Sequence, residues 1–134
     1  MRPPALRLAG CILRNDAGDI LLLHRNKKGV QQWELPGGKL EQDEEGEAAA
    51  IREIHEELGV EVRIVAFLGQ ADFQENDRRC CYEWYEAELV ATLASPRICE
   101  PQTFDDLRYW NAASLKDRPD VSANLQNLLK SGVV

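Results

Sequence analysis

One run of 23 residues, from Gly38 to Val60, constrains this chain more than any other segment. It reads GKLEQDEEGEAAAIREIHEELGV, and its second half has the pattern of an amphipathic helix. Its apolar residues are three and four positions apart and share one face: Ile51, Ile54 and Leu58. Gly59 comes next, as is common where a helix ends in the left-handed conformation. The pattern predicts a helix over residues 45–58 that packs on a hydrophobic core.

Three glutamates occupy nearly the opposite face of this predicted helix. Glu53, Glu56 and Glu57 stand at relative positions i, i+3 and i+4, so their side chains look outward together. Like charges at this spacing repel each other, and a bound cation would relieve the repulsion. Hard cations such as Mg²⁺ prefer carboxylate and carbonyl oxygens, and Arg52 is placed to hold one carboxylate through a bidentate pair. A solvated acidic face is the simpler alternative.

The run resembles the Nudix box, Gx5Ex7REUxEExGU, in which U is a bulky aliphatic residue. Every specified position is matched: Gly38, Glu44, Arg52, Glu53, Ile54, Glu56, Glu57, Gly59 and Val60. The resemblance implies the α/β/α sandwich of Nudix proteins, with a mixed sheet between helices. It also implies an enzyme that hydrolyses a phosphoanhydride bond in a nucleoside diphosphate linked to another group, X.

The resemblance further implies a Mg²⁺ site, at which Mn²⁺ is an alternative ion. The expected ligands are carboxylates and a glycine carbonyl: Glu53, Glu56, Glu57 and either Gly37 or Gly38. Glycines at this turn would let the backbone approach metal and phosphates closely. The expected catalytic set is Glu53 as the first choice of base, Glu57, and Arg52, which would orient Glu53 or Glu56. Glu44 would support the ligands or bind a further ion.

Other candidates lie outside the predicted helix. Arg25 and Lys39 are the cations expected to contact substrate phosphates. Because the base of Nudix proteins often lies elsewhere in the chain, the alternative bases are the acids before a predicted strand at Leu107–Trp110: Glu100, Asp105 and Asp106. We expect His24 to be structural. Aromatic side chains able to stack on a nucleobase are Trp33, Phe73, Tyr82, Trp84, Tyr85, Tyr109 and Trp110, although most aromatics in a sheet belong to the core.

Length and composition favour one globular domain over residues 1–134, with 44% hydrophobic and 29% charged residues. No apolar run reaches the length of about 18 residues that a membrane span needs, and the N-terminus lacks a secretory signal pattern, so we expect a cytoplasmic protein. The net charge of −7 argues against sequence-independent nucleic-acid binding but permits a small phosphorylated substrate that arrives with metal. The four cysteines form no CxxC pair, and we expect buried, reduced thiols.

The rest of the chain alternates predicted strands with turns. The expected strands cover residues 6–14, 20–25, 32–35, 60–72, 78–93 and 107–110. The continuous apolar run in the second of these predicts a strand covered on both faces. Residues 75–77 are expected to close a long hairpin, whose exposed edge offers a surface for a homodimer. Ser122 is expected to cap a last helix that ends before Gly132.

The substrate remains open among several nucleotides. The stretch WELPGGKLE and the small size look most like MutT-type nucleoside triphosphate pyrophosphohydrolases, which would act on an NTP or dNTP, oxidised ones included. ADP-ribose or another nucleotide conjugate is the second hypothesis. The third is a Nudix-like module that binds nucleotides without cleaving them, although such modules commonly lose box acids that this chain retains.

Overall fold

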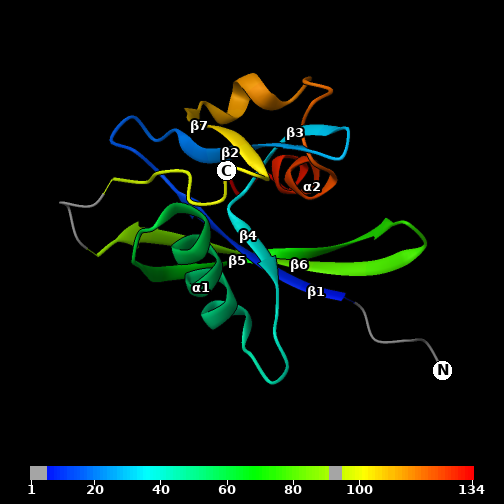
Figure 1. The fold of residues 1–134 in the computed structure, drawn as a ribbon, viewed down its shortest axis with the longest axis horizontal. Helices are drawn as coiled ribbons and strands as arrows, with labels where there is room; N and C mark the ends of the chain where they lie inside the picture. The colour runs from blue at the N-terminus through cyan, green and yellow to red at the C-terminus, as the bar shows by residue number, and fades with distance from the viewer. Residues whose placement is uncertain (1–5, 91–94) are drawn as a thin grey trace.

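The computed structural model describes residues 6–90 and 95–134, in which two sheets lie between two helices (Figure 1). The strands are β1 (Leu6–Leu13), β2 (Ile20–Lys27), β3 (Val30–Glu34), β4 (Gly37–Lys39), β5 (Val62–Glu75), β6 (Arg78–Leu89) and β7 (Phe104–Trp110). The helices are α1 (Gly46–Leu58), a 3₁₀ turn η1 (Ala112–Leu115) and α2 (Ala123–Ser131). None of the helices described is long and apolar enough to cross a membrane.

The larger sheet has the strand order β4-β1-β6-β5 and is mixed. Strand β1 pairs parallel with β6 and antiparallel with β4, while β5 and β6 form the long antiparallel hairpin that extends beyond the body in Figure 1. The hairpin turns at Asn76 and Asp77, which both have positive φ. That geometry suits a two-residue turn between twisted strands, as expected for residues 75–77.

The smaller sheet has the order β3-β2-β7 and is antiparallel. Its central strand is buried on both faces: Leu21 and Leu23 join the core under α1, whereas Ile20 and Leu22 join the core under α2. This confirms the prediction made from the continuous apolar run. Strand β1 alternates in the same way, with Cys11 on the α1 side and Ile12 on the α2 side.

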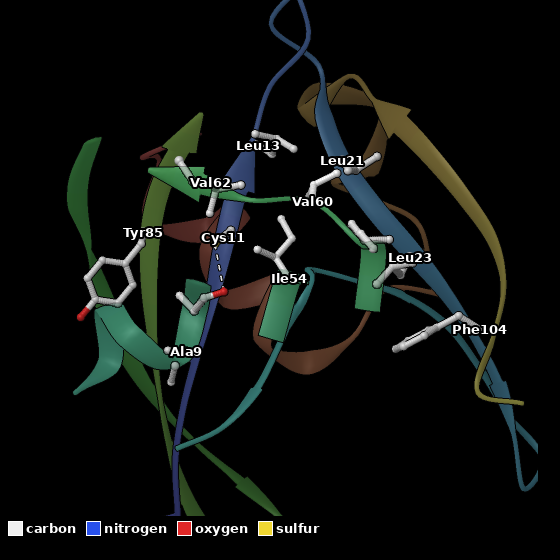
Figure 2. Close-up of a cluster of buried hydrophobic side chains, with 14 residues drawn as sticks. Ala9, Cys11, Leu13, Leu21, Leu23, Ile54, Val60, Val62, Tyr85 and Phe104 are labelled. Carbon is white, nitrogen blue, oxygen red and sulfur yellow. Dashed lines mark hydrogen bonds between the residues drawn. The ribbon is translucent and has the colours of Figure 1, made fainter. Parts of the chain in front are cut away.

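Figure 2 shows the core under α1. Ile54 of the helix packs among side chains of β1 and β2 and beside Val60 and Val62, which follow the helix. The Cys11 thiol donates a hydrogen bond of 3.5 Å to the backbone carbonyl of Ala50, drawn as the dashed line. Because Ile54 is completely buried, this face fixes the rotation of α1 about its axis. The rotation in turn decides where the glutamates point.

Several expectations need correction. The α/β/α sandwich with a mixed sheet is confirmed, but a second, antiparallel sheet accompanies the mixed one. Residues 37–39, expected as part of a turn, form β4 against β1. The strand expected over 78–93 ends at Leu89, and residues 91–94 lie outside the described part. The last helix begins after Ser122 and ends at Ser131, before Gly132, as predicted. All four cysteines are free; Cys11 and Cys80 are buried as expected, but Cys99 is exposed.

Candidate active site

The three glutamates of α1 differ in their surroundings more than the sequence predicts. Glu56 is solvent-exposed, Glu53 is partly covered, and Glu57 is only 5% exposed. The expectation that all three look outward is therefore wrong for Glu57. Its carboxylate accepts a hydrogen bond of 2.8 Å from the backbone N–H of Gly37 in β4, so the side chain turns inward toward the glycine strand.

Arg52 is the centre of an ion-pair network around these acids. Its guanidinium donates two hydrogen bonds of 2.9 Å to the two oxygens of Glu44, a bidentate arrangement. The same group reaches Glu53 at 3.0 Å, Glu56 at 3.3 Å and the backbone carbonyl of Lys39 at 3.0 Å. Arg52 therefore ties the loop before the helix, the helix and β4 together, and the pKa of Glu44 falls to about 2 because of its hydrogen bonds to Arg52.

The glycines of β4 are required by close approach to side chains. A Cβ on Gly38 would lie 2.5 Å from the carboxyl carbon of Glu53. A Cβ on Gly37 would lie 2.2 Å from the hydroxyl oxygen of Tyr82. Neither glycine has a positive φ, so the constraint is space rather than backbone conformation. The backbone of β4 consequently runs directly beside Glu53 and Glu57.

The acids raise one another's pKa values. Burial raises the pKa of Glu57 to about 9, and the neighbouring charges of Glu53 and Glu100 add to the effect. Burial also raises the pKa of Glu53, although Arg52 opposes the shift. Glu100 is brought here by two backbone hydrogen bonds, from Arg97 to the carbonyl of Leu58 and from Cys99 to that of Glu57. Such a crowd of carboxylates favours the arrival of a cation.

The donor set suits a hard divalent ion, since it consists of carboxylate and backbone carbonyl oxygens. Among residues 6–90 and 95–134, no three acids, histidines or cysteines are already arranged as a ligand group. The carboxylates instead accept hydrogen bonds from the protein itself: Arg52 donates to Glu53 and Glu56, and the backbone N–H of Gly37 donates to Glu57. An ion would therefore compete with these hydrogen bonds for the carboxylates.

A cavity of about 420 Å³ adjoins the glycine strand, and we refer to it as the box cavity. Gly37, Gly38 and Lys39 line one end, and Phe73, Tyr82 and Asn124 line other parts of its wall. Arg25 also lines it, but its guanidinium is held by both oxygens of Glu34 at 2.8 and 3.0 Å. Of the two predicted phosphate-binding cations, Lys39 therefore has the more exposed position.

The remaining candidate bases lie elsewhere. Asp105 binds His24 at 2.6 Å and Asn26 at 2.9 Å, and Asp106 binds Arg108 at 2.9 Å. Asp105, Asp106 and His24 line a different cavity, beside Trp33 and Trp110. Only Glu100, of the three alternatives, acts on the pKa values of Glu53 and Glu57.

Asn124 is a residue of the cavity wall that the sequence patterns did not indicate. This residue follows the predicted cap Ser122 by two positions, and its side chain is 8% exposed at the wall of the box cavity. A polar residue inside the first turn of an amphipathic helix was the available signal. Asn111, by contrast, uses its side chain to accept a hydrogen bond from the backbone N–H of Ala113.

Comparison with known proteins gives a consistent result. The family model described as "NUDIX domain" matches residues 5–130. Diphosphoinositol polyphosphate phosphohydrolase 2 of Mus musculus is 38% identical over 72 residues, which cover 53% of this chain and 39% of that protein. RNA pyrophosphohydrolase of Methylococcus capsulatus is 36% identical over 125 residues, covering 78% of this chain and 64% of that protein. The chain thus spans less than two thirds of either relative.

One solved structure illustrates the shared fold. The MutT NUDIX hydrolase from Burkholderia pseudomallei is 28% identical to this chain, with a TM-score of 0.81. The superposition covers 97% of this chain and 99% of that one. The likeness therefore includes both sheets and both helices rather than the glutamate helix alone.

Proposed function

The chain belongs to the Nudix family, and on this premise we propose that it hydrolyses an NTP or dNTP, oxidised forms included, to the monophosphate and pyrophosphate. One observation carries the proposal: Glu53 and Glu57 contact the glycine strand β4, and the two glycines of that strand line the box cavity. The cavity volume of about 420 Å³ is within the usual range for small-molecule sites. A triphosphate lying along β4 would bring its anhydride bonds to the acids.

The residues fit a Mg²⁺ site, with Mn²⁺ as an alternative ion. Glu53, Glu56 and Glu57 would hold the ion, together with a backbone carbonyl of Gly37 or Gly38. When bound, such an ion neutralises charge on the polyphosphate and lowers the pKa of a coordinated water. Glu44, which is tied to Arg52, would keep that arginine in position beside the ligands.

The chain itself supplies the base. Glu53 is our first choice, because burial raises the pKa of its carboxyl group and so makes it a better proton acceptor. Glu100 is the alternative, since its charge acts on both Glu53 and Glu57. Arg52 orients Glu53 through its 3.0 Å hydrogen bond, and Glu57 would be fixed by the backbone of Gly37.

The box cavity has a cationic side chain in one part of its wall and aromatic and amide side chains in another, and these would bind different parts of the substrate. Lys39 stands at the β4 end, where a cation would pair with phosphate oxygens. The aromatic ring of Phe73 and the amide of Asn124 offer stacking and hydrogen bonding to a nucleobase. The proposed partner is therefore a small nucleotide. Cytoplasmic localisation and a homodimer through the β5 edge remain predictions.

A substrate panel tests the proposal. The purified protein is incubated with Mg²⁺ and, separately, with NTPs, dNTPs, ADP-ribose, a 5′-triphosphorylated RNA and a diphosphoinositol polyphosphate. We expect turnover of a triphosphate with release of pyrophosphate. Turnover of ADP-ribose alone would move the assignment to conjugate hydrolysis, and tight nucleotide binding without any turnover would favour a binding module.

A matched pair of variants then tests the site. Glu57→Gln retains an oxygen that can accept from Gly37 but loses the charge, and we expect a loss of at least about 10²-fold in kcat. Glu47→Gln lies in the first turn of the same helix on an exposed position and should retain activity. Equal activity of the two variants would overturn the assignment of Glu57.

A further inference from the structure

Residues 97–105 run from the last turn of α1 to the end of β2, and we refer to them as the Glu100 segment. The two backbone hydrogen bonds to α1 described above hold its first end. Its middle carries Glu100, whose charge acts on Glu53 and Glu57. The hydrogen bonds of residues 6–90 and 95–134 include none to the Glu100 side chain. The place of this carboxylate therefore depends on how the backbone of the segment is held.

The carboxylate of Asp105 fastens the second end of the Glu100 segment to β2. One of its oxygens accepts a hydrogen bond of 2.6 Å from the Nδ1–H of His24, and the other accepts one of 2.9 Å from the amide of Asn26. These two hydrogen bonds lower the pKa of Asp105. A carboxylate engaged in this way is a poor proton acceptor, so Asp105 is unsuited to the role of base.

Backbone hydrogen bonds connect this fastening to Glu100. The carbonyl of Glu100 accepts from the N–H groups of Thr103 and Phe104, each at 3.0 Å, and the N–H of Asn26 donates to the carbonyl of Thr103 at 2.8 Å. Phe104 is 2% exposed and points into the core under α1 (Figure 2). A tight turn thus joins Glu100 to Asp105, and a displacement of Asp105 would displace the turn.

We propose that Asp105 is a positioning residue, which holds Glu100 toward the acids of α1 through its two hydrogen bonds to β2. The proposal rests on the proposed function, because it gives Glu100 a task in hydrolysis. Asp105 itself lines the other cavity, on the far side of β2 from Arg25 and the box cavity. It acts on the reaction through Glu100 without touching the substrate.

A double-mutant cycle separates positioning from a general effect on stability. Asp105→Ala removes both acceptors, and Glu100→Gln removes the charge that they place. We expect each change to lower kcat for triphosphate hydrolysis by at least about tenfold, with a much smaller change in KM. The double variant should be no slower than Glu100→Gln alone, because both changes remove the same contribution. Losses that multiply in the double variant, or a wild-type kcat in Glu100→Gln, would overturn the proposal.

Binding of Mn²⁺ to the full chain without nucleotide gives a second readout, which does not depend on turnover. A carboxylate near the ion strengthens its binding, so Asp105→Ala and Glu100→Gln should each weaken Mn²⁺ binding by about threefold or more, and not additively. Titration calorimetry measures these affinities. A wild-type affinity in folded Asp105→Ala would overturn the proposal.

Asn26→Ala covers the case in which Asp105→Ala does not fold. It removes one of the two side-chain hydrogen bonds and retains the pair of His24 with Asp105. We expect a smaller loss of kcat and of Mn²⁺ affinity, and no further loss when Glu100→Gln is already present. A loss of equal size in both backgrounds would contradict the proposal.

Glu86→Ala is the matched control. It breaks another partly buried ion pair, the 3.1 Å contact of Glu86 with Arg14. Because Tyr85 and Ala87 face the core under α1, Glu86 points to the opposite side of β6. This variant should lower Tm while kcat and Mn²⁺ affinity stay unchanged.

Failure of the proposal and failure of the proposed function give different results. If no triphosphate is hydrolysed but Asp105→Ala and Glu100→Gln weaken Mn²⁺ binding non-additively, the proposed function fails and the positioning stands. If a triphosphate is hydrolysed and Asp105→Ala behaves like Glu86→Ala, the positioning fails and the function stands.

Discussion

The Glu57 carboxylate and the backbone N–H of Gly37 form a hydrogen bond of 2.8 Å between the last turn of α1 and strand β4. An exposed glutamate on a helix would accept hydrogen bonds from water, whereas the buried Glu57 carboxylate accepts one from Gly37. The carboxylate is consequently held beside β4, and burial together with the charges of Glu53, Glu100 and Glu34 raises its pKa. The burial of the Glu57 carboxylate among other acids is unfavourable, and a bound cation would reduce that unfavourable free energy.

The first prediction concerns the pH dependence of stability without divalent ions. The pKa of folded Glu57 is raised from 4.5 to about 9, so the folded state holds a proton that the unfolded state releases. This contribution is fully present below pH 4.5 and is lost as the pH rises through 9. In EDTA, Glu57→Gln should therefore be more stable than the wild type at pH 8, by roughly 2–4 kcal/mol.

Urea unfolding at several pH values between 5 and 9 measures this difference. The two proteins should converge toward pH 5, where Glu57 of the wild type is neutral. Parallel pH profiles for the wild type and the variant would show that Glu57 is not the group responsible.

The second prediction concerns Mg²⁺. Ion binding requires ionised carboxylates, so it should release protons and become tighter with rising pH. At a free concentration 100 times Kd, the ion would stabilise the protein by about 2.7 kcal/mol. Thermal unfolding with Mg²⁺ or EDTA at pH 6 and pH 8 measures the effect. A larger gain in Tm at pH 6 would contradict the assignment.

The third prediction concerns Arg52. A lysine can supply the charge but not the paired donors that bind Glu44 and the Lys39 carbonyl, so Arg52→Lys should lower kcat/KM by about 10–100-fold. The control is Arg63→Lys on β5, which alters an exposed ion pair with Glu88 of β6 and should have almost no effect on kcat/KM. Equal losses of kcat/KM in the two variants would contradict the role assigned to the paired donors of Arg52.

The fourth prediction concerns Gly38. Alanine there would displace the Glu53 carboxylate, and a displacement near 1 Å can cost about 10²-fold in rate. Steady-state kinetics measures this loss, with Gly18→Ala as the comparison. Gly18 has a φ of +83° and open space around it, so that change should lower Tm and spare activity. Loss of Tm without loss of rate in Gly38→Ala would refute the argument.

The sequence predicted features that depend on neighbours in the chain. The glutamate helix, its end at Gly59, the hairpin turn at residues 75–77 and the cap at Ser122 all follow local rules, and each matches the structure. The buried run in β2 was also predictable, because four consecutive apolar residues need cover on both faces.

Other features depend on contacts between distant segments and could not be predicted in this way. The burial of Glu57 results from strand β4, whose partner β1 lies far away in the sequence. Glu100 reaches the acids through backbone hydrogen bonds of residues 97 and 99, which no periodicity encodes. The side chain of Asn124 accepts a hydrogen bond from Trp84, and because the two residues are 40 positions apart no local pattern predicts this contact.

The alternation of side chains in β1 and β2 has a consequence for the cooperativity of unfolding. Each strand feeds both hydrophobic layers, through Cys11 and Leu21 on one side and Ile12 and Leu22 on the other. Neither layer can unfold on its own, because the packing of the other layer holds β1 and β2 in their native positions. Denaturation should accordingly be a single cooperative transition. A substitution that destabilises the layer beneath α2 should therefore lower the free energy of unfolding of α1 by the same amount, although α1 lies on the other side of the sheets.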